Sequence, residues 1–147
     1  MCTTWDPEHA LATEHPDITV REVPAHQMPP NTLAVVNYHE RRVDVLVGQP
    51  ARQRVCTLTH EYVHIQRGPV PGWLTAREER KVDEIAARLL ISDEALADAM
   101  VWCFDQHELA DHLHVDVPTV IARLEGLTDT ETKELNEWLD TAELTNP

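Results

Sequence analysis

Apolar and polar residues alternate with the period of β-strands in the first third of the chain. Residues 18–23 alternate in this way, and two β-rich runs at residues 33–38 and 42–47 are separated by three residues, as in a hairpin. These runs predict a small, mainly antiparallel β-sheet. A short helix is also expected before Pro16, where apolar residues cluster.

In the middle of the chain, apolar residues recur at the spacing of an α-helix. One apolar stripe begins at Val55 and reaches Ile65, and Gly and Pro residues within 68–72 end this helix. A second helix is expected from Thr75, because Thr75 and Glu78 form a capping-box pattern that precedes another apolar face. The pattern therefore predicts two consecutive helices joined by a short turn.

The C-terminal part predicts helices only, each with an N-cap residue followed by apolar residues at helical spacing. The predicted fold class is therefore α+β. We expect the 147 residues to form a single domain, with strands mainly in 1–49, the two consecutive helices in 50–92 and further helices in 93–147. The predicted N-cap residues of the later helices are Ser92, Asp105, Asp116 and Thr128.

Acidic residues are concentrated in the second half of the sequence. Residues 1–82 hold 10 acids and 9 bases, whereas residues 83–147 hold 16 acids and 3 bases, so these parts carry net charges of -1 and -13. Such an acidic surface repels phosphate backbones, so we expect no direct contact with nucleic acid. A basic protein partner is compatible with it.

Signals for secretion or membrane insertion are not found in the sequence. The first 20 residues carry acids, among them Asp6, Glu8 and Glu14, and lack the basic start and apolar stretch of a signal peptide, and no later segment approaches the length of a membrane span. The cysteines Cys2, Cys56 and Cys103 are odd in number and widely spaced, which suits reduced thiols. We therefore expect a cytoplasmic protein that does not enter the membrane.

The first of the two consecutive helices contains His60-Glu61-Tyr62-Val63-His64, an H-E-x-x-H motif. Two histidines four residues apart lie on one face of a helix, about 6 Å apart along its axis, so their imidazoles can bind one Zn²⁺. Glu61 projects beside that face, where its carboxylate could take a proton from a water molecule activated by the metal. The motif predicts a zinc hydrolase in which Glu61 is the general base.

A third metal ligand is expected, because catalytic zinc sites usually combine three protein ligands with one open position. The second helix can present a carboxylate to the metal after the short turn. Taking 100° per residue, Glu79 lies within about 50° of the centre of its apolar face, where a carboxylate needs a compensating cation. Glu78 is comparably placed and stays an alternative, although capping offers it another role. Asp83, at the edge of this face, is a candidate for orienting a ligand histidine.

These two helices resemble those of the ImmA/IrrE family of H-E-x-x-H metallopeptidases. TLTHEYVHI at 57–65 is similar to the family's histidine helix, and EERKVDEIAARLLIS at 78–92 is similar to the next helix, E-x-x-A-[ND]-x-F-A-A-x-L-L-[MI]-P. On that pattern Glu79 matches the acidic ligand and Asp83 the Asn/Asp position. The departures at Val82, Ile85 and Ser92 remove no ligand and no base.

A less specific similarity continues in ELADHLHVDVPTVIARLEGL at 108–127, so the resemblance covers about residues 33–127. It implies a zincin-like fold that binds Zn²⁺ and cleaves a regulatory protein, such as a helix-turn-helix repressor in a phage or mobile element. We therefore expect a zinc-dependent endopeptidase. The alternative is a noncatalytic, metal-containing module that binds a repressor or toxin, although such a module would not need Glu61.

Substrate binding in a site of this kind needs two further features. An exposed strand edge would hold the substrate extended, and either strand of the hairpin qualifies. A hydrogen-bond donor to the developing oxyanion is also expected, and Tyr38 and His39 at the end of the hairpin are the nearest candidates.

Two other patterns point to function less strongly. Residues 109–127 resemble a helix-turn-helix, yet the second helix offers Arg123 and little other positive charge for DNA, so we interpret it as a helix pair used for packing or protein binding. A group of metal-binding residue types at 103–114 has a spacing that fits no standard zinc template, and its acidic neighbours favour a solvated helix. Its members are Cys103, His107, His112 and His114.

Overall fold

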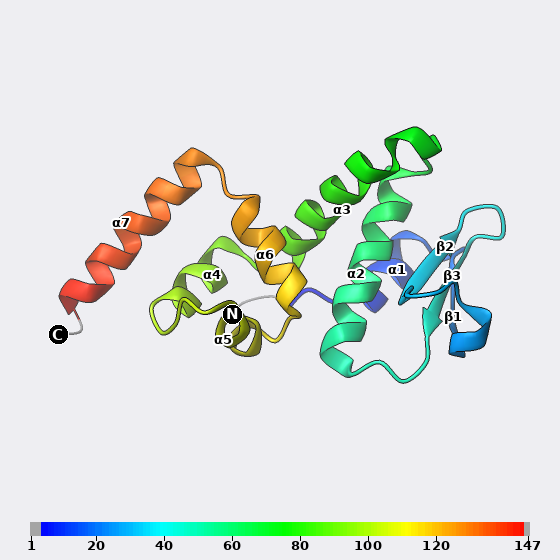
Figure 1. Ribbon diagram of the computed structural model, residues 1–147, viewed down its shortest axis with the longest axis horizontal. Coiled ribbons are helices and arrows are strands. Elements are labelled where there is room, and N and C mark those ends of the chain that lie inside the picture. The colour runs from blue at the N-terminus through cyan, green and yellow to red at the C-terminus, as the bar shows by residue number, and fades with distance from the viewer. Residues whose placement is uncertain (1–3, 146–147) are drawn as a thin grey trace. The chain divides into compact units, whose positions relative to one another are not determined.

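The computed structural model describes residues 4–145, which form an α+β structure of seven α-helices and one three-stranded sheet (Figure 1). The chain divides into two compact units, Met1–Ala86 and Ala87–Pro147, so the expectation of a single domain stays a prediction. None of the described helices is both long and apolar enough to cross a membrane. The helices are α1 (Pro7–Glu14), α2 (Ala51–Arg67), α3 (Thr75–Leu90), α4 (Asp93–Met100), α5 (Gln106–Leu113), α6 (Val117–Glu125) and α7 (Asp129–Thr145).

The sheet of the first unit is mixed, which corrects the expectation of a mainly antiparallel sheet. β2 (Ala34–Asn37) and β3 (Arg42–Leu46) form the predicted hairpin, with Asn37 opposite Arg42. β1 (Thr19–Val23) pairs with β3 in parallel, and the strand order is β1-β3-β2. The chain reverses direction twice between β1 and β3, so these two strands run the same way once the hairpin places β3 beside β1. Alternation of apolar residues does not encode strand direction.

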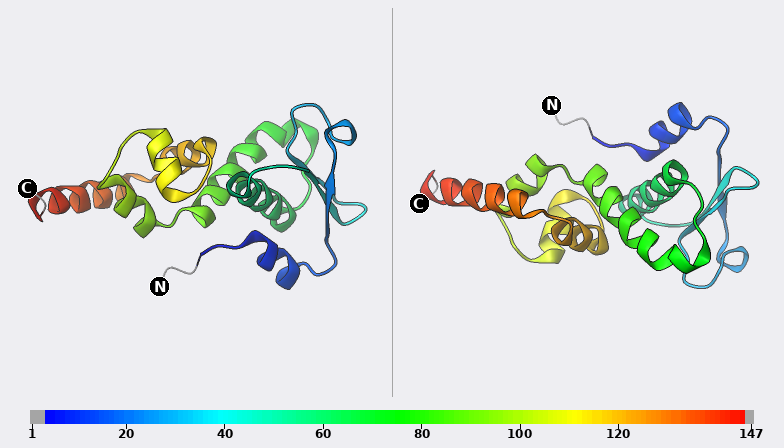
Figure 2. Two further views of the ribbon diagram at one scale, coloured as in Figure 1. Left: turned by 90° about the horizontal axis from the view of Figure 1, so that it is seen from below. Right: turned by 90° about the horizontal axis from the view of Figure 1, so that it is seen from above.

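Helix α2 forms the centre of the first unit, where it packs against β2 on one side and α1 on the other (Figures 1 and 2). Its Leu58 is 1% exposed, and Val43 and Val45 of β3 are fully buried. The helix ends at Arg67, and its C-cap Gly68 has a φ of +82°, in the region that favours glycine. After the short turn η2 (Gly72–Leu74), α3 runs back past α2.

The second unit consists of the end of α3 followed by α4 to α7. Its four predicted N-caps are confirmed, because each cap side chain accepts a hydrogen bond from a backbone N–H in the first helical turn. At the start of α7 the cap is reciprocal, since the backbone N–H of Thr128 donates to the Glu131 carboxylate at 2.7 Å. Fully buried core residues of this unit include Ile91, Leu96, Leu109 and Val120.

Candidate metal centre

Helix α2 presents the two histidines of the motif on one face. The side chains of His60 and His64 are 26% and 16% exposed, so both are partly open to solvent. Their ring centroids lie 4.8 Å apart, and their Nε2 atoms are separated by 3.1 Å. The i, i+4 spacing therefore brings the two imidazoles to one point, as a helix requires.

Helix α3 brings Glu79 to the same point. Its carboxylate oxygens Oε2 and Oε1 lie 3.1 Å from Nε2 of His60 and 3.0 Å from Nε2 of His64. Within residues 4–145, these three side chains form the single group of three or more potential ligands whose donor atoms all lie within 4.8 Å of one another. The three predicted metal ligands are thus gathered in one cluster.

Glu78, the alternative third ligand, is engaged elsewhere. Its two carboxylate oxygens accept hydrogen bonds from Nε and Nη2 of Arg67 at 2.5 and 3.1 Å. This guanidinium lowers the pKa of the Glu78 carboxyl below its usual value. The capping role expected for Glu78 is therefore replaced by an ion pair that joins the last turn of α2 to the first turn of α3. Of the two neighbouring glutamates, Glu79 is the one that faces the histidines.

Asp83 lies one turn further along α3 and contacts the other nitrogen of His60. The distance from Nδ1 of His60 to Oδ1 of Asp83 is 3.0 Å. Burial of the His60 ring opposes its positive charge, but the hydrogen bond to Asp83 and the neighbouring carboxylates raise the pKa of His60 above its usual value. A ring whose Nδ1–H donates to a carboxylate directs the lone pair of Nε2 toward the cluster.

The donor chemistry of the cluster fits a divalent cation. Neutral imidazole nitrogens and a carboxylate are all hydrogen-bond acceptors, and three such groups that meet at 3.0 to 3.1 Å repel one another unless a proton or a metal lies among them. Ligand atoms around a tetrahedral Zn²⁺ at bond lengths of about 2.05 Å are roughly 3.3 Å apart, which is close to these separations. Nitrogen and carboxylate donors also suit zinc.

Glu61 follows His60 on α2, and only 7% of it is exposed. Burial raises the pKa of the Glu61 carboxyl to about 7, with His60 opposing this change and the negative charge of Glu79 adding to it. A carboxylate that titrates near neutrality can both accept and return a proton at physiological pH. The structure therefore places a buried glutamate with a raised pKa next to the first of the predicted ligands.

Tyr38 makes a contact that the sequence did not predict. Its hydroxyl donates a hydrogen bond to the backbone carbonyl of His64 at 3.0 Å, which ties the end of β2 to the last turn of α2. Burial, together with Glu61 and other nearby carboxylates, raises the pKa of Tyr38. Tyr38 thus lies within electrostatic range of the cluster, whereas His39 lies in the exposed turn after β2. A role of either residue toward an oxyanion stays a prediction.

The remaining cysteines and histidines form no comparable cluster in the part of the chain that the structure describes. Cys56 is buried in α2, and Cys2 lies outside the described residues. The chain matches no protein-family model, and its sequence and structure match no curated protein and no solved structure. What the cluster does must therefore be inferred from the geometry and chemistry of its own residues.

Proposed function

We propose that this chain is a zinc-dependent endopeptidase of the ImmA/IrrE type with a zincin-like site. The observation that carries the proposal is the convergence of His60, His64 and Glu79 within 3.1 Å of one another, with buried Glu61 next to the first of them. A structural metal site needs only ligands, whereas a hydrolytic site also needs a base. Burying a glutamate at this position is unfavourable, because its charge loses contact with water, and the need for a base in a hydrolytic site explains why it is buried there.

The ligands of the metal would be His60, His64 and Glu79. When bound, Zn²⁺ would supply Lewis-acid polarisation of a peptide carbonyl and would make water more acidic. Asp83 would hold the ring of His60 in the tautomer that offers Nε2, through the contact of 3.0 Å at Nδ1.

Glu61 would move the proton during hydrolysis. Its carboxylate would accept a proton from the water that attacks the scissile carbonyl, as the new C–O bond forms. It would then give this proton to the leaving amine as the C–N bond breaks, which returns Glu61 to its starting state. The raised pKa near 7 suits both transfers.

The sheet offers one strand edge next to this helix. β3 is paired on both sides, whereas β2 lies at the edge of the sheet and packs against α2. An extended substrate segment could therefore add to β2, with main-chain hydrogen bonds holding it alongside the cluster. Of the two hairpin strands considered as substrate-binding edges, the proposal thus takes β2.

We take the substrate to be a regulatory protein such as a helix-turn-helix repressor, acting in the cytoplasm and in the setting of a phage or mobile element. This assignment comes from the resemblance of 57–65 and 78–92 to the ImmA/IrrE helices. Peptide hydrolysis itself is supported by the cluster. The net charge of -14 makes a direct complex with nucleic acid unfavourable.

The deciding experiment compares the wild type with Glu61→Gln, using a helix-turn-helix repressor as the candidate substrate and zinc analysis of both proteins. We expect Glu61→Gln to bind zinc like the wild type and to lose at least about 100-fold in cleavage rate, because only the base is removed. The matched control is Glu84→Gln on α3, where Glu84 pairs with Lys81 at 3.3 Å, and it should cleave normally.

Two outcomes would redirect the proposal. If wild type and Glu61→Gln both bind zinc and neither cleaves the repressor, the noncatalytic module that binds a repressor or toxin becomes the better explanation. A folded, unchelated sample that contains no zinc would rule out both functions together.

A further inference from the structure

The second unit contains an apolar cleft that the proposed hydrolytic site does not use. It lies between α4 and α7 and has a volume of about 380 Å³. Trp138, on its α7 side, is 46% exposed although it is a large apolar side chain. Exposed aromatic residues in a cleft are typical of surfaces that bind another molecule. The apolar lining consists of Leu96, Ala97, Leu127, Leu135 and Trp138.

Carboxylates line the same cleft from both helices. Helix α4 contributes Asp93 and Glu94 at its beginning and Asp98 in its second half, and the first turns of α7 contribute Glu131 and Glu134. Glu94, Asp98 and Glu134 are exposed. An apolar floor with a charged rim of one sign selects a ligand that is apolar in the middle and positively charged around it.

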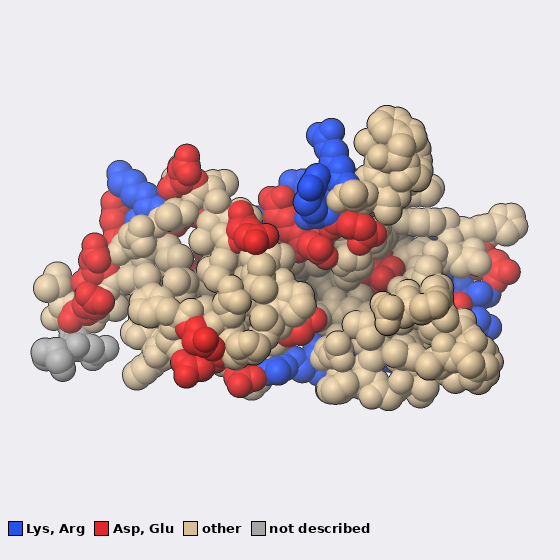
Figure 3. Space-filling model, in the orientation of Figure 1, with Lys and Arg blue, Asp and Glu red and all other residues tan. Residues whose placement is uncertain are grey.

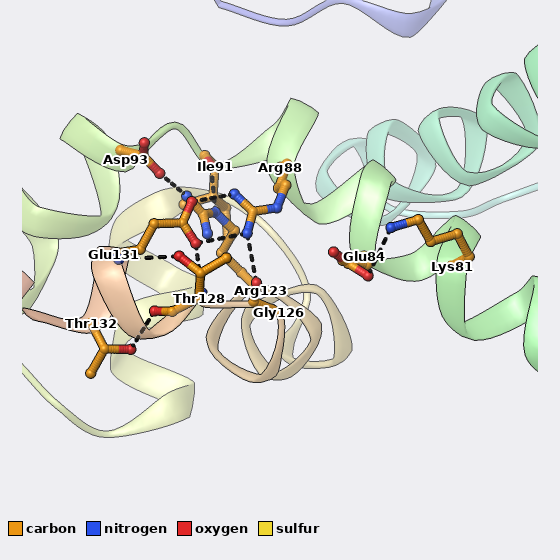
Figure 4. A network of polar contacts seen from close by, with 10 residues as sticks. All are labelled: Lys81, Glu84, Arg88, Ile91, Asp93, Arg123, Gly126, Thr128, Glu131 and Thr132. Carbon is orange, nitrogen blue, oxygen red and sulfur yellow. Dashed lines mark hydrogen bonds and ion pairs between the residues drawn. The ribbon is translucent and has the colours of Figure 1, made fainter.

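Two arginines hold the walls of the cleft in place (Figure 4). Arg123 is 2% exposed, and it donates from Nε to the carbonyl of Ile91 at 2.8 Å and pairs with Asp93 at the start of α4. Arg88 donates to both carboxylate oxygens of Glu131 on α7, at 2.7 and 2.9 Å. These contacts are present without a ligand, so the free energy of binding is not reduced by an entropic cost of ordering the walls of the cleft.

The net negative charge of this unit favours a positively charged partner. Residues 87–147 contain 14 acids and 3 bases, a net charge of -11. Two of the bases, Arg88 and Arg123, are used in the contacts above, and the third, Lys133, lies 3.9 Å from Glu137 on α7. Acidic side chains accordingly predominate along α7 in Figure 3. Nucleic acid and a second copy of this unit would both be repelled.

We propose that the cleft between α4 and α7 binds a basic amphipathic helix of a partner protein. Apolar side chains three or four residues apart on that helix would contact Leu96, Leu135 and Trp138, and its Lys and Arg side chains would meet the carboxylates of the rim. The cleft is built entirely from the second unit, so this binding does not depend on zinc or on peptide hydrolysis.

The test uses the full chain and a synthetic helical peptide of about 18 residues, with Leu at every third or fourth position and Lys or Arg elsewhere. A second peptide has the same composition but is scrambled so that the Leu residues form no stripe. Isothermal titration calorimetry should show binding of the amphipathic peptide only, with an affinity that falls as salt is raised. Equal binding of the two peptides, or no binding of either, would overturn the proposal.

The apolar part of the cleft is tested with Trp138→Ala. We expect binding of the amphipathic peptide to weaken about tenfold, because the largest apolar contact is removed. The matched control is Trp102→Ala, which removes a tryptophan that is 75% exposed in the loop after α4 and does not line the cleft. Circular dichroism checks that both variants are folded. Equal weakening by the two variants would contradict the location.

The acidic rim is tested with a triple variant of exposed residues, which avoids any question of folding. We expect the variant to bind the amphipathic peptide about tenfold more weakly and to lose most of the salt dependence. A control triple variant removes the same charge elsewhere in the unit, and an equal loss in both would show that binding follows net charge rather than the cleft. The rim variant is Glu94→Gln, Asp98→Asn and Glu134→Gln, and the control is Glu125→Gln, Asp140→Asn and Glu143→Gln.

Discussion

The two units of this chain use carboxylates in opposite ways. In Met1–Ala86, with 12 acids and 9 bases, two carboxylates are aimed at histidine nitrogens at distances of 3.0 to 3.1 Å. In Ala87–Pro147, with 14 acids and 3 bases, carboxylates are spread around an apolar cleft, and two of them, Asp93 and Glu131, pair with arginines. The first arrangement suits a small ion, and the second suits a large basic partner.

This difference shows that net charge is a poor guide to where potential metal ligands converge. The less acidic unit has the cluster that fits a metal, because the ligand atoms of His60, His64 and Glu79 converge there. The other ring nitrogen of His60, Nδ1, already contacts Asp83, which leaves Nε2 for the metal. In the more acidic unit the field is stronger, but its carboxylates do not converge with histidines among the described residues. Convergence gives ion selectivity, whereas total charge gives long-range attraction.

Removing one predicted ligand should have the largest effect, and it should change binding by the first unit while leaving the second unit unaffected. We expect His64→Ala to weaken zinc binding by more than about 100-fold, since one of three protein ligands is lost. Binding of the basic peptide to the second unit should be unchanged. The control His112→Ala removes a histidine of α5 and should bind zinc like the wild type. Calorimetric zinc titration of both proteins gives the answer, and normal affinity in His64→Ala would refute the ligand set.

A smaller effect is expected at Asp83, which contacts a ligand rather than the metal. Asp83→Asn keeps the size of the side chain but weakens the hydrogen bond from Nδ1 of His60, so zinc affinity should fall about tenfold. Glu84→Gln, at the next position of α3, should leave the affinity unchanged. Competition with a chelator measures both values. If Asp83→Asn binds zinc as tightly as the wild type, Asp83 does not position His60.

The part of the cluster that lies on a single helix could be predicted from the sequence. His60, Glu61 and His64 are related by helical geometry alone, and the spacing of four residues put both histidines on one face of α2. The choice between Glu78 and Glu79 was not predictable in this way, because both lie near the same face of α3. It depends on Arg67, whose guanidinium takes both oxygens of Glu78, and this contact joins two helices.

Features that depend on contacts between elements could not be predicted from local patterns. All four N-caps of the second unit were predicted, because a cap and the backbone N–H groups that donate to it are neighbours in sequence. The parallel pairing of β1 with β3 was not, since both strands show the same alternation whichever way they run. The cleft was also missed, because α4 and α7 are about 30 residues apart and their packing is set by buried Arg123 and by Arg88.

The smallest expected effect concerns the ion pair on the α7 side of the cleft and appears as a pH dependence. The side chain of Arg88 and the backbone of Thr128 lower the pKa of Glu131 to about 2 in the folded protein, below its ordinary value of 4.5. A carboxyl group with a lowered pKa stabilises the folded state above the unfolded pKa, and this contribution is lost as the pH falls toward the folded pKa.

Glu131→Gln should therefore be less stable than the wild type at pH 7, and the difference should shrink between about pH 5 and pH 2. Thermal unfolding of both proteins across this range measures it, with Glu137→Gln as the control for losing one charge from α7. A difference that stays constant with pH would show that the Arg88 pair does not hold α7 in place through charge.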